Sequence, residues 1–83
     1  DMNNSPTTPA AIRWRMRRGM RELDMIMTRW FDARYDAAPE PERQAFLDLL
    51  DIEDPDLWAW LMGHSPAPEG RLSELIEQLR EYR

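Results

Sequence analysis

Few side chains in this sequence are of the types that carry out catalysis or hold metal ions. His64 is the only histidine, and the chain has no cysteine. A lone histidine cannot complete a metal site or a nucleophile–base pair, and without cysteine there are no thiolate ligands, thiol nucleophiles or disulfides. His64 follows Gly63, which ends a helical pattern, so we interpret it as an exposed loop residue. The sequence predicts no catalytic residue and no metal site, and we do not expect an enzyme.

The carboxylates and glycines fit structural roles better than chemical ones. Most acidic residues fall on outward positions of amphipathic patterns. Asp54-Pro55-Asp56 is typical of a helix start, where Asp caps free N–H groups and proline suits the first turn. Three scattered glycines cannot form a phosphate-binding loop. Phosphoryl transfer and acid–base catalysis therefore have no support in the sequence.

The segment 17–22, Arg-Arg-Gly-Met-Arg-Glu, is harder to explain by structure alone. Gly19 lies at a bend between two expected helices, where the missing side chain allows a left-handed backbone or close approach of another chain. Arg18 and Glu22 can pair if the helix continues through, but an exposed pair contributes less than about 1 kcal/mol. Clustered arginines with Trp14 nearby are typical of the centre of a recognition surface. A simple helix break remains the alternative.

Helical patterns account for the elements that must position this segment. Thr8-Pro9 is typical of an N-cap followed by the first residue of a helix, which we expect to reach about Arg18 and to end at Gly19. A second helix is predicted from about Met20 to Asp36, because apolar residues recur there every three or four positions. This predicted buried stripe consists of Leu23, Ile26, Met27, Trp30 and Phe31, with Tyr35 closing its last turn. Met20 and Met25 stay unassigned between core and binding surface.

Three further helices follow the proline pair Pro39 and Pro41. The first is predicted to bury Ala45, Phe46, Leu49 and Leu50 and to turn Glu42, Asp48 and Asp51 outward. The second begins at Asp54 and ends at Gly63, and the third places Leu72, Leu75, Ile76, Leu79 and Tyr82 on one face. No stretch alternates with period two, so we expect an all-α fold, a compact bundle of about five short helices. We assign residues 1–9 to a disordered N-terminal tail and residues 10–83 to a single helical domain.

The charge distribution argues against nucleic acid as a partner. Residues 11–34 contain seven arginines and three acidic residues, a net charge of +4, whereas the whole chain carries −5. Phosphates would be repelled by the acidic remainder, so an acidic protein partner or a solvated face explains the basic region better. No apolar run approaches the roughly 20 residues needed to cross a bilayer, and no signal peptide is apparent. The lack of cysteine fits a reducing cytosol, so we expect a cytoplasmic protein without membrane insertion.

The segment Arg18-Gly19-Met20-Arg21-Glu22 resembles the RGxxE motif of the bacterial and mitochondrial succinate dehydrogenase flavinylation factors. The resemblance covers roughly residues 11–64, and the C-terminal helix fits it more loosely. It is carried by Trp14, residues 17–24, Phe31, Tyr35, Phe46, Leu49-Leu50, Asp54-Pro55-Asp56-Leu57 and Trp60-Leu61-Met62. The Pro-rich segment before the third helix departs from the family, in which many members have a Ser or Asp cap there.

The resemblance implies a bacterial assembly factor that binds the flavoprotein subunit of succinate dehydrogenase, and often of fumarate reductase. Such a factor promotes covalent attachment of FAD to its client and needs no stably bound cofactor itself, because the bond-forming chemistry belongs to the flavin and the flavoprotein. The residues that the resemblance places at the client are Arg18, Gly19 and Glu22, flanked by Trp14, Arg17, Met20, Arg21 and Asp24. We expect a monomer when the client is absent.

Two other functions are compatible with a small acidic helical protein. An antitoxin-like regulatory module would bind a protein toxin encoded nearby and would act without any flavoprotein. A helical nucleic-acid binder would use the arginine-rich region, and its affinity would fall steeply with salt.

Overall fold

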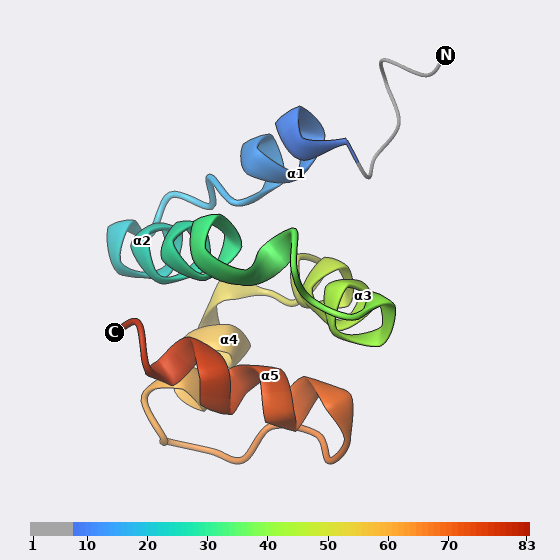
Figure 1. Cartoon of the computed structure of the whole chain (residues 1–83). Helices are drawn as coiled ribbons and strands as arrows, with labels where there is room; N and C mark the ends of the chain where they lie inside the picture. The colour runs from blue at the N-terminus through green and yellow to red at the C-terminus, as the bar shows by residue number, and fades with distance from the viewer. Residues whose placement is uncertain (1–7) are drawn as a thin grey trace.

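The computed structural model describes residues 8–83, and these residues form five α-helices, one π-helical segment and no strand. The α-helices are α1 (Pro9–Arg15), α2 (Arg21–Trp30), α3 (Glu40–Leu49), α4 (Asp54–Leu61) and α5 (Arg71–Arg80). The π-helix η2 (Phe31–Tyr35) continues α2 directly. Figure 1 shows α1 and α5 on opposite sides of α2. The predicted all-α bundle of about five helices is confirmed.

Helix α1 begins as predicted and ends earlier. The Thr8 hydroxyl accepts a hydrogen bond from the Ala11 N–H at 3.3 Å, and Pro9 is the first helical residue. The helix ends at Arg15 instead of near Arg18. The shorter helix leaves Arg18 outside the helical path, so that its side chain turns toward the connection between α3 and α4. Residues 1–7 of the predicted tail lie outside the described part of the chain.

Helices α2 and η2 bury the predicted stripe and supply the centre of the core. Every predicted stripe residue is at most 7% exposed, and Tyr35 packs against the cluster. The ring of Trp30 stacks on that of Phe46 from α3, with centroids 4.6 Å apart. The hydrogen bonding changes from α to π at Phe31, a change the spacing of apolar residues does not reveal. This contact buries two large aromatic rings between α2 and α3.

The remaining helices close the core. Helix α3 buries the predicted Ala45, Phe46, Leu49 and Leu50, with Leu50 as its C-cap. Helices α4 and α5 bury Leu57, Leu61, Leu75, Ile76 and Leu79, and the remaining buried residues are Ile12, Met16 and Ala38. Gly63 follows α4 with a φ of 77°, in agreement with its predicted role as a helix stop. No helix among residues 8–83 combines the length and the apolar character needed to cross a bilayer.

Two predictions about acidic residues were wrong. Glu42 was expected to face outward, but it is half-buried and accepts a hydrogen bond from the Gln78 side chain of α5. Asp54 was expected to cap α4, but Glu53 is the N-cap, and Asp54 lies in the first turn. Both carboxylates are used for contacts between elements far apart in the sequence, and a helical pattern cannot indicate such partners.

Candidate functional site

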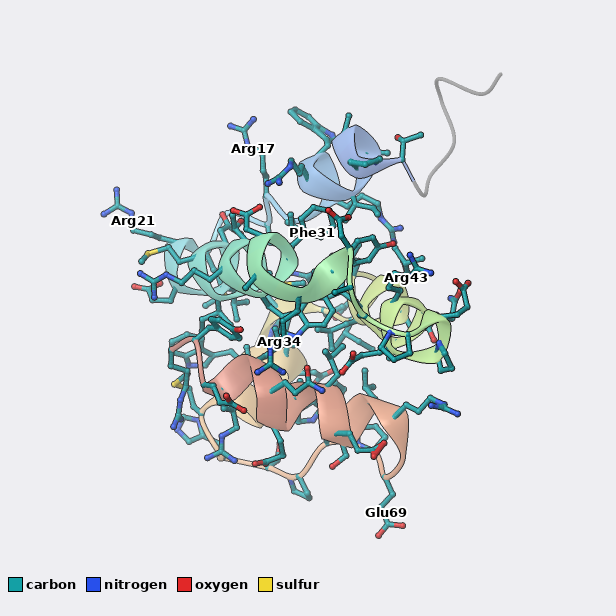
Figure 2. All side chains as sticks on the ribbon, viewed as in Figure 1. Arg17, Arg21, Phe31, Arg34, Arg43 and Glu69 are labelled. Carbon is teal, nitrogen blue, oxygen red and sulfur yellow. The ribbon has the colours of Figure 1, made fainter. Side chains whose placement is uncertain are left out.

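The candidate site is the connection between α1 and α2 together with the residues on either side of it. We call its five outward-facing residues the motif surface. They are Trp14, Arg17, Gly19, Arg21 and Glu22. All of them are exposed. Figure 2 shows Arg17 and Arg21 extending away from the body at the same end of the molecule. The surface therefore combines an aromatic ring, two cations and a carboxylate around a glycine.

Glu22 occupies the first turn of α2 and faces solvent. Among residues 8–83 its side chain makes no hydrogen bond and no ion pair. The N-cap residue Met20 provides no side-chain hydrogen bond, so the carboxylate benefits only from the positive end of the helix dipole. That benefit is about 0.3–1 kcal/mol at an exposed position. Glu22 is thus accessible to a partner, and its docking role remains a prediction.

Arg18 lies inside the fold. Its guanidinium donates to the Asp54 carboxylate, to the Leu50 carbonyl at 3.0 Å and to the Ile52 carbonyl. The side chain of Arg18 is only 10% exposed. The pairing with Glu22, which required a helix continuing through Gly19, does not form, because α1 ends at Arg15, α2 begins at Arg21 and the guanidinium points to the α3–α4 connection. A planar group with five donors suits this arrangement of one carboxylate and two carbonyls.

Asp24 holds the main chain of Arg18 in place. Its carboxylate accepts a hydrogen bond from the Arg18 N–H at 2.9 Å, from a half-buried position in the first turn of α2. Arg18 is consequently held at both its backbone and its side chain. Met20 is also half-buried and packs against the core. Arg18, Asp24 and Met20, all predicted to be site residues, thus tie the connection down beneath the motif surface.

Gly19 has a φ of 93°, a conformation that L side chains rarely adopt. A Cβ atom added there would meet no atom of this chain within 4 Å. Within this chain, position 19 therefore favours glycine because of its backbone conformation and not because a side chain would lack space. That open space also leaves room for the main chain of a partner to approach closely.

The Gly19→Ala substitution is expected to cost about 1–2 kcal/mol of stability through backbone strain, and to impair function further by filling the open space. Gly70→Ala is a matched control, because Gly70 also has a positive φ of 112° with an open Cβ position, at the start of α5. Thermal melting should show similar losses for both variants, while only Gly19→Ala reduces binding of a partner at a temperature where both remain folded. Equal partner binding by the two variants would contradict this account.

Trp14 and Arg17 form a second contact element on the motif surface. The Trp14 side chain is 70% exposed, and the Arg17 guanidinium lies over its ring, 5.3 Å from the centroid. Tryptophan and arginine are enriched among the residues that dominate protein–protein binding energies. Trp14 is exposed on α1, whereas Ile12 on the same helix and its C-cap Met16 are buried, and Arg17 follows the helix end.

Several residues near the site were not predicted. Asp54 was missed as the partner of Arg18, because the two are 36 positions apart in the sequence. An apolar groove beside Glu22, lined in part by Met25, Trp58 and Met62, was also missed. The exposure of Met25 at 42% is the signal that assigns it to the surface, and the sequence pattern had left it undecided.

The candidate site contains no histidine and no cysteine, and its catalytic or metal-binding potential is limited to isolated carboxylates. Within residues 8–83, no three His, Cys, Asp or Glu side chains lie together as a metal site requires. His64 is exposed in the connection between α4 and α5, as predicted. The motif surface offers charges, hydrogen-bonding groups and an aromatic ring, and residues of these types are enriched at protein–protein contacts.

Comparison with known proteins gives the same family from several directions. A sequence model of the family described as the flavinator of succinate dehydrogenase matches residues 10–83. The chain is 41% identical over 71 residues to the FAD assembly factor SdhE of Yersinia pseudotuberculosis, covering 86% of this chain and 81% of the relative. It is 43% identical over 77 residues to the protein of the same name from Xylella fastidiosa, covering 93% and 79%. The Aliivibrio fischeri relative is 37% identical over 73 residues, covering 88% and 85%.

Proposed function

Since the chain belongs to the family of succinate dehydrogenase flavinators, we propose that it binds the flavoprotein subunit of succinate dehydrogenase and promotes covalent attachment of FAD to that subunit. The observation that carries this proposal to particular residues is the exposed, unpaired carboxylate of Glu22 in the first turn of α2, beside a connection that Asp24 and Asp54 hold through Arg18. Glu22 is the residue that contacts the client, and Gly19 allows the client to approach.

The proposed mechanism is positioning. Covalent flavinylation joins the flavin to a side chain of the flavoprotein, so the reacting groups belong to the client and its cofactor. A helper that holds the client in a reactive arrangement accelerates such a step without taking part in bond formation. We propose that this chain works in this way, without being an enzyme in the usual sense and without a stably bound cofactor of its own.

The charges of the motif surface define what the client must present. Glu22 needs a cation or a hydrogen-bond donor, whereas Arg17 and Arg21 make no ion pair among residues 8–83 and so remain available for acceptors. Opposite charges placed close together select one orientation of the partner, because a rotated client would place like charges together. The pattern suits a defined patch of the flavoprotein better than a uniformly charged polymer.

The proposal also covers which flavoproteins this chain serves, its oligomeric state without a client and where in the cell it acts. We propose the fumarate reductase flavoprotein as a second client, a monomer when no client is present, and action in the bacterial cytoplasm, where the client is assembled. The lack of cysteine supports the last point. The antitoxin-like alternative gains no support from the family or the relatives.

Deletion of the gene tests the proposal directly. In the deletion strain, the denatured succinate dehydrogenase flavoprotein band should lose most of its covalent flavin fluorescence. Expression of the wild-type chain should restore the signal. Undiminished fluorescence in the deletion strain would contradict the proposed function, and rescue of a toxic phenotype without any flavoprotein would favour the antitoxin-like alternative.

A further inference from the structure

A groove of about 250 Å³ runs between α2 and α4, beside the motif surface. On α2 its lining residues are Glu22, Met25, Ile26 and Arg29. Their spacing of three, one and three positions puts them in one row along the helix, about 10 Å long. Trp58 and Met62, four positions apart on α4, form the opposite wall, and Arg83 completes it. The groove thus begins at Glu22, the residue proposed to contact the client.

The walls of the groove are apolar and partly open to solvent. Met25 is 42% exposed, whereas Ile26 beneath it is buried at 4%. Trp58 and Met62 are half-buried and pack on the core with one side, leaving the other side toward the groove. Methionine side chains adapt to irregular partners, and apolar surface gathered in a hollow is typical of protein interaction sites. The core accounts for Ile26 but not for the exposure of Met25.

The rim of the groove carries charges of opposite sign at its two ends. Glu22 is without a partner, as described above. At the other end of the row on α2, the Arg29 guanidinium donates to the Tyr82 carbonyl at 3.1 Å. On the facing wall, the Arg83 guanidinium donates to the Leu61 carbonyl at 3.1 Å. Neither arginine faces a carboxylate among residues 8–83. The two cations are therefore oriented by main-chain carbonyls while their charge remains uncompensated.

A second hollow, of about 510 Å³, lies along α2 beside the groove. Gly19, Arg21, Asp24, Met25, Thr28 and Arg29 line it. Met25 and Arg29 are common to both hollows and form the ridge between them. The groove is consequently continuous with the motif surface through Glu22 on one side and through Gly19 on the other.

We propose that this groove receives an apolar segment of the client flavoprotein, one that inserts a large apolar side chain between Met25 and Trp58 and carries a carboxylate to Arg29 and Arg83. The inference rests on the proposed function and deepens it by naming the chemistry of a second contact. A carboxylate at the arginine end and an apolar residue in the middle complement the charges and the walls of the groove. Continuity with Glu22 assigns the occupant to the same client that the motif surface binds.

The Met25→Glu variant tests the groove. The new carboxylate would lie four positions before Arg29, so it would place a charge in the apolar middle of the groove and compete for the cation that the client carboxylate needs. The dissociation constant for the purified flavoprotein subunit should therefore rise about tenfold or more. Met25→Leu is the matched control and should bind within about threefold of the wild-type chain, because it keeps the apolar volume. Both variants should melt close to the wild-type chain, since Met25 is partly exposed in the free protein.

A photo-reactive benzophenone side chain at position 25 identifies the occupant. The expected crosslink joins a flavoprotein peptide in which an apolar residue neighbours an Asp or Glu. If Met25→Glu binds the flavoprotein with wild-type affinity while Glu22→Arg binds it more weakly, the groove is not a client-binding site, and the proposed function stands. Failure of the wild-type chain to bind the flavoprotein would overturn both. A crosslink to a second copy of this chain would replace the client with a dimer contact and overturn the inference.

Discussion

The Glu22→Arg variant is expected to lose nearly all support for flavinylation while keeping its fold. The reversed charge would face the client group that normally pairs with Glu22, and like charges at an interface cost several kcal/mol. Inside the chain the substitution removes only a favourable helix-dipole contact and places a cation at the same helix end, at a cost of about 1 kcal/mol. Covalent flavin in the denatured client should fall below about a tenth of the wild-type level, because about 1.4 kcal/mol already corresponds to a factor of ten in binding.

Glu74→Arg is the matched control for this prediction. Glu74 is an exposed acid in the first turn of α5, a helix that likewise lacks a side-chain cap, and it has no ion pair among residues 8–83. Circular dichroism and thermal melting should therefore change by similar small amounts in both variants. Full flavinylation with Glu22→Arg, or an equal defect with Glu74→Arg, would remove Glu22 from the docking surface. Global unfolding of Glu22→Arg alone would make it a structural residue.

Among substitutions that remove a polar contact, Arg18→Ala is expected to lower the free energy of unfolding most. It removes three hydrogen bonds, leaves the Leu50 and Ile52 carbonyls without their donor and leaves Asp54, which is 28% exposed, without its cation. Hydrogen bonds to charged groups contribute about 1.5–3 kcal/mol each, and their contributions overlap within one network. We expect a loss of about 2–4 kcal/mol, measured by urea unfolding.

Arg18→Lys separates charge from geometry. An ammonium can reach one acceptor well but cannot serve a carboxylate and two carbonyls with a planar fork, so most of the loss should persist. Arg13→Ala is a suitable control, because the Arg13–Asp32 pair is exposed on both sides and should contribute no more than about 1 kcal/mol. Wild-type stability of Arg18→Ala would contradict the role of Arg18 as the anchor of the connection.

The same anchor links the fold to the proposed function. Arg18 belongs to the RGxxE segment but is turned inward, whereas Gly19, Arg21 and Glu22 of the same segment are exposed. Release of the connection would let Glu22 and Gly19 move relative to each other, which lowers affinity even in the molecules that stay folded. At a temperature well below its melting point, Arg18→Ala should therefore still bind the client more weakly than the wild-type chain. Binding at wild-type affinity under those conditions would limit Arg18 to a purely structural role.

The sequence was sufficient to predict the helices and most of the core. Apolar residues at three- and four-residue spacing gave the buried stripe of α2, and the same reasoning identified the inner faces of α3 and α5. Thr8 capped α1 as predicted, because an N-cap and a proline at the first position act within one turn. Trp14 was predicted to belong to a recognition surface, and its 70% exposure agrees with a surface position. These features depend on neighbours close in sequence.

Contacts between distant segments could not be predicted from one sequence. The Arg18–Asp54 pair joins the α1–α2 connection to the first turn of α4, 36 positions away in the sequence, and each residue had a plausible local role that misled the interpretation. Glu42 was misassigned for the same reason. An acidic residue at an outward position of a helical pattern can equally accept a hydrogen bond from another helix, as Glu42 does from Gln78. The groove depends on how α4 lies against α2, so Trp58 and Met62 gave no signal by themselves.

Hydrogen exchange of the free and client-bound chain tests the central claim, that the α1–α2 connection and the start of α2 form the docking surface. Helix α2 has no side-chain cap, so the N–H groups of its first turn should exchange quickly in the free chain. Binding of the flavoprotein subunit is predicted to slow exchange across residues 17–29 and to leave the exposed face of α3 and the α4–α5 connection unchanged. Unchanged exchange in residues 17–29, with protection on α3 or the α4–α5 connection instead, would contradict the account.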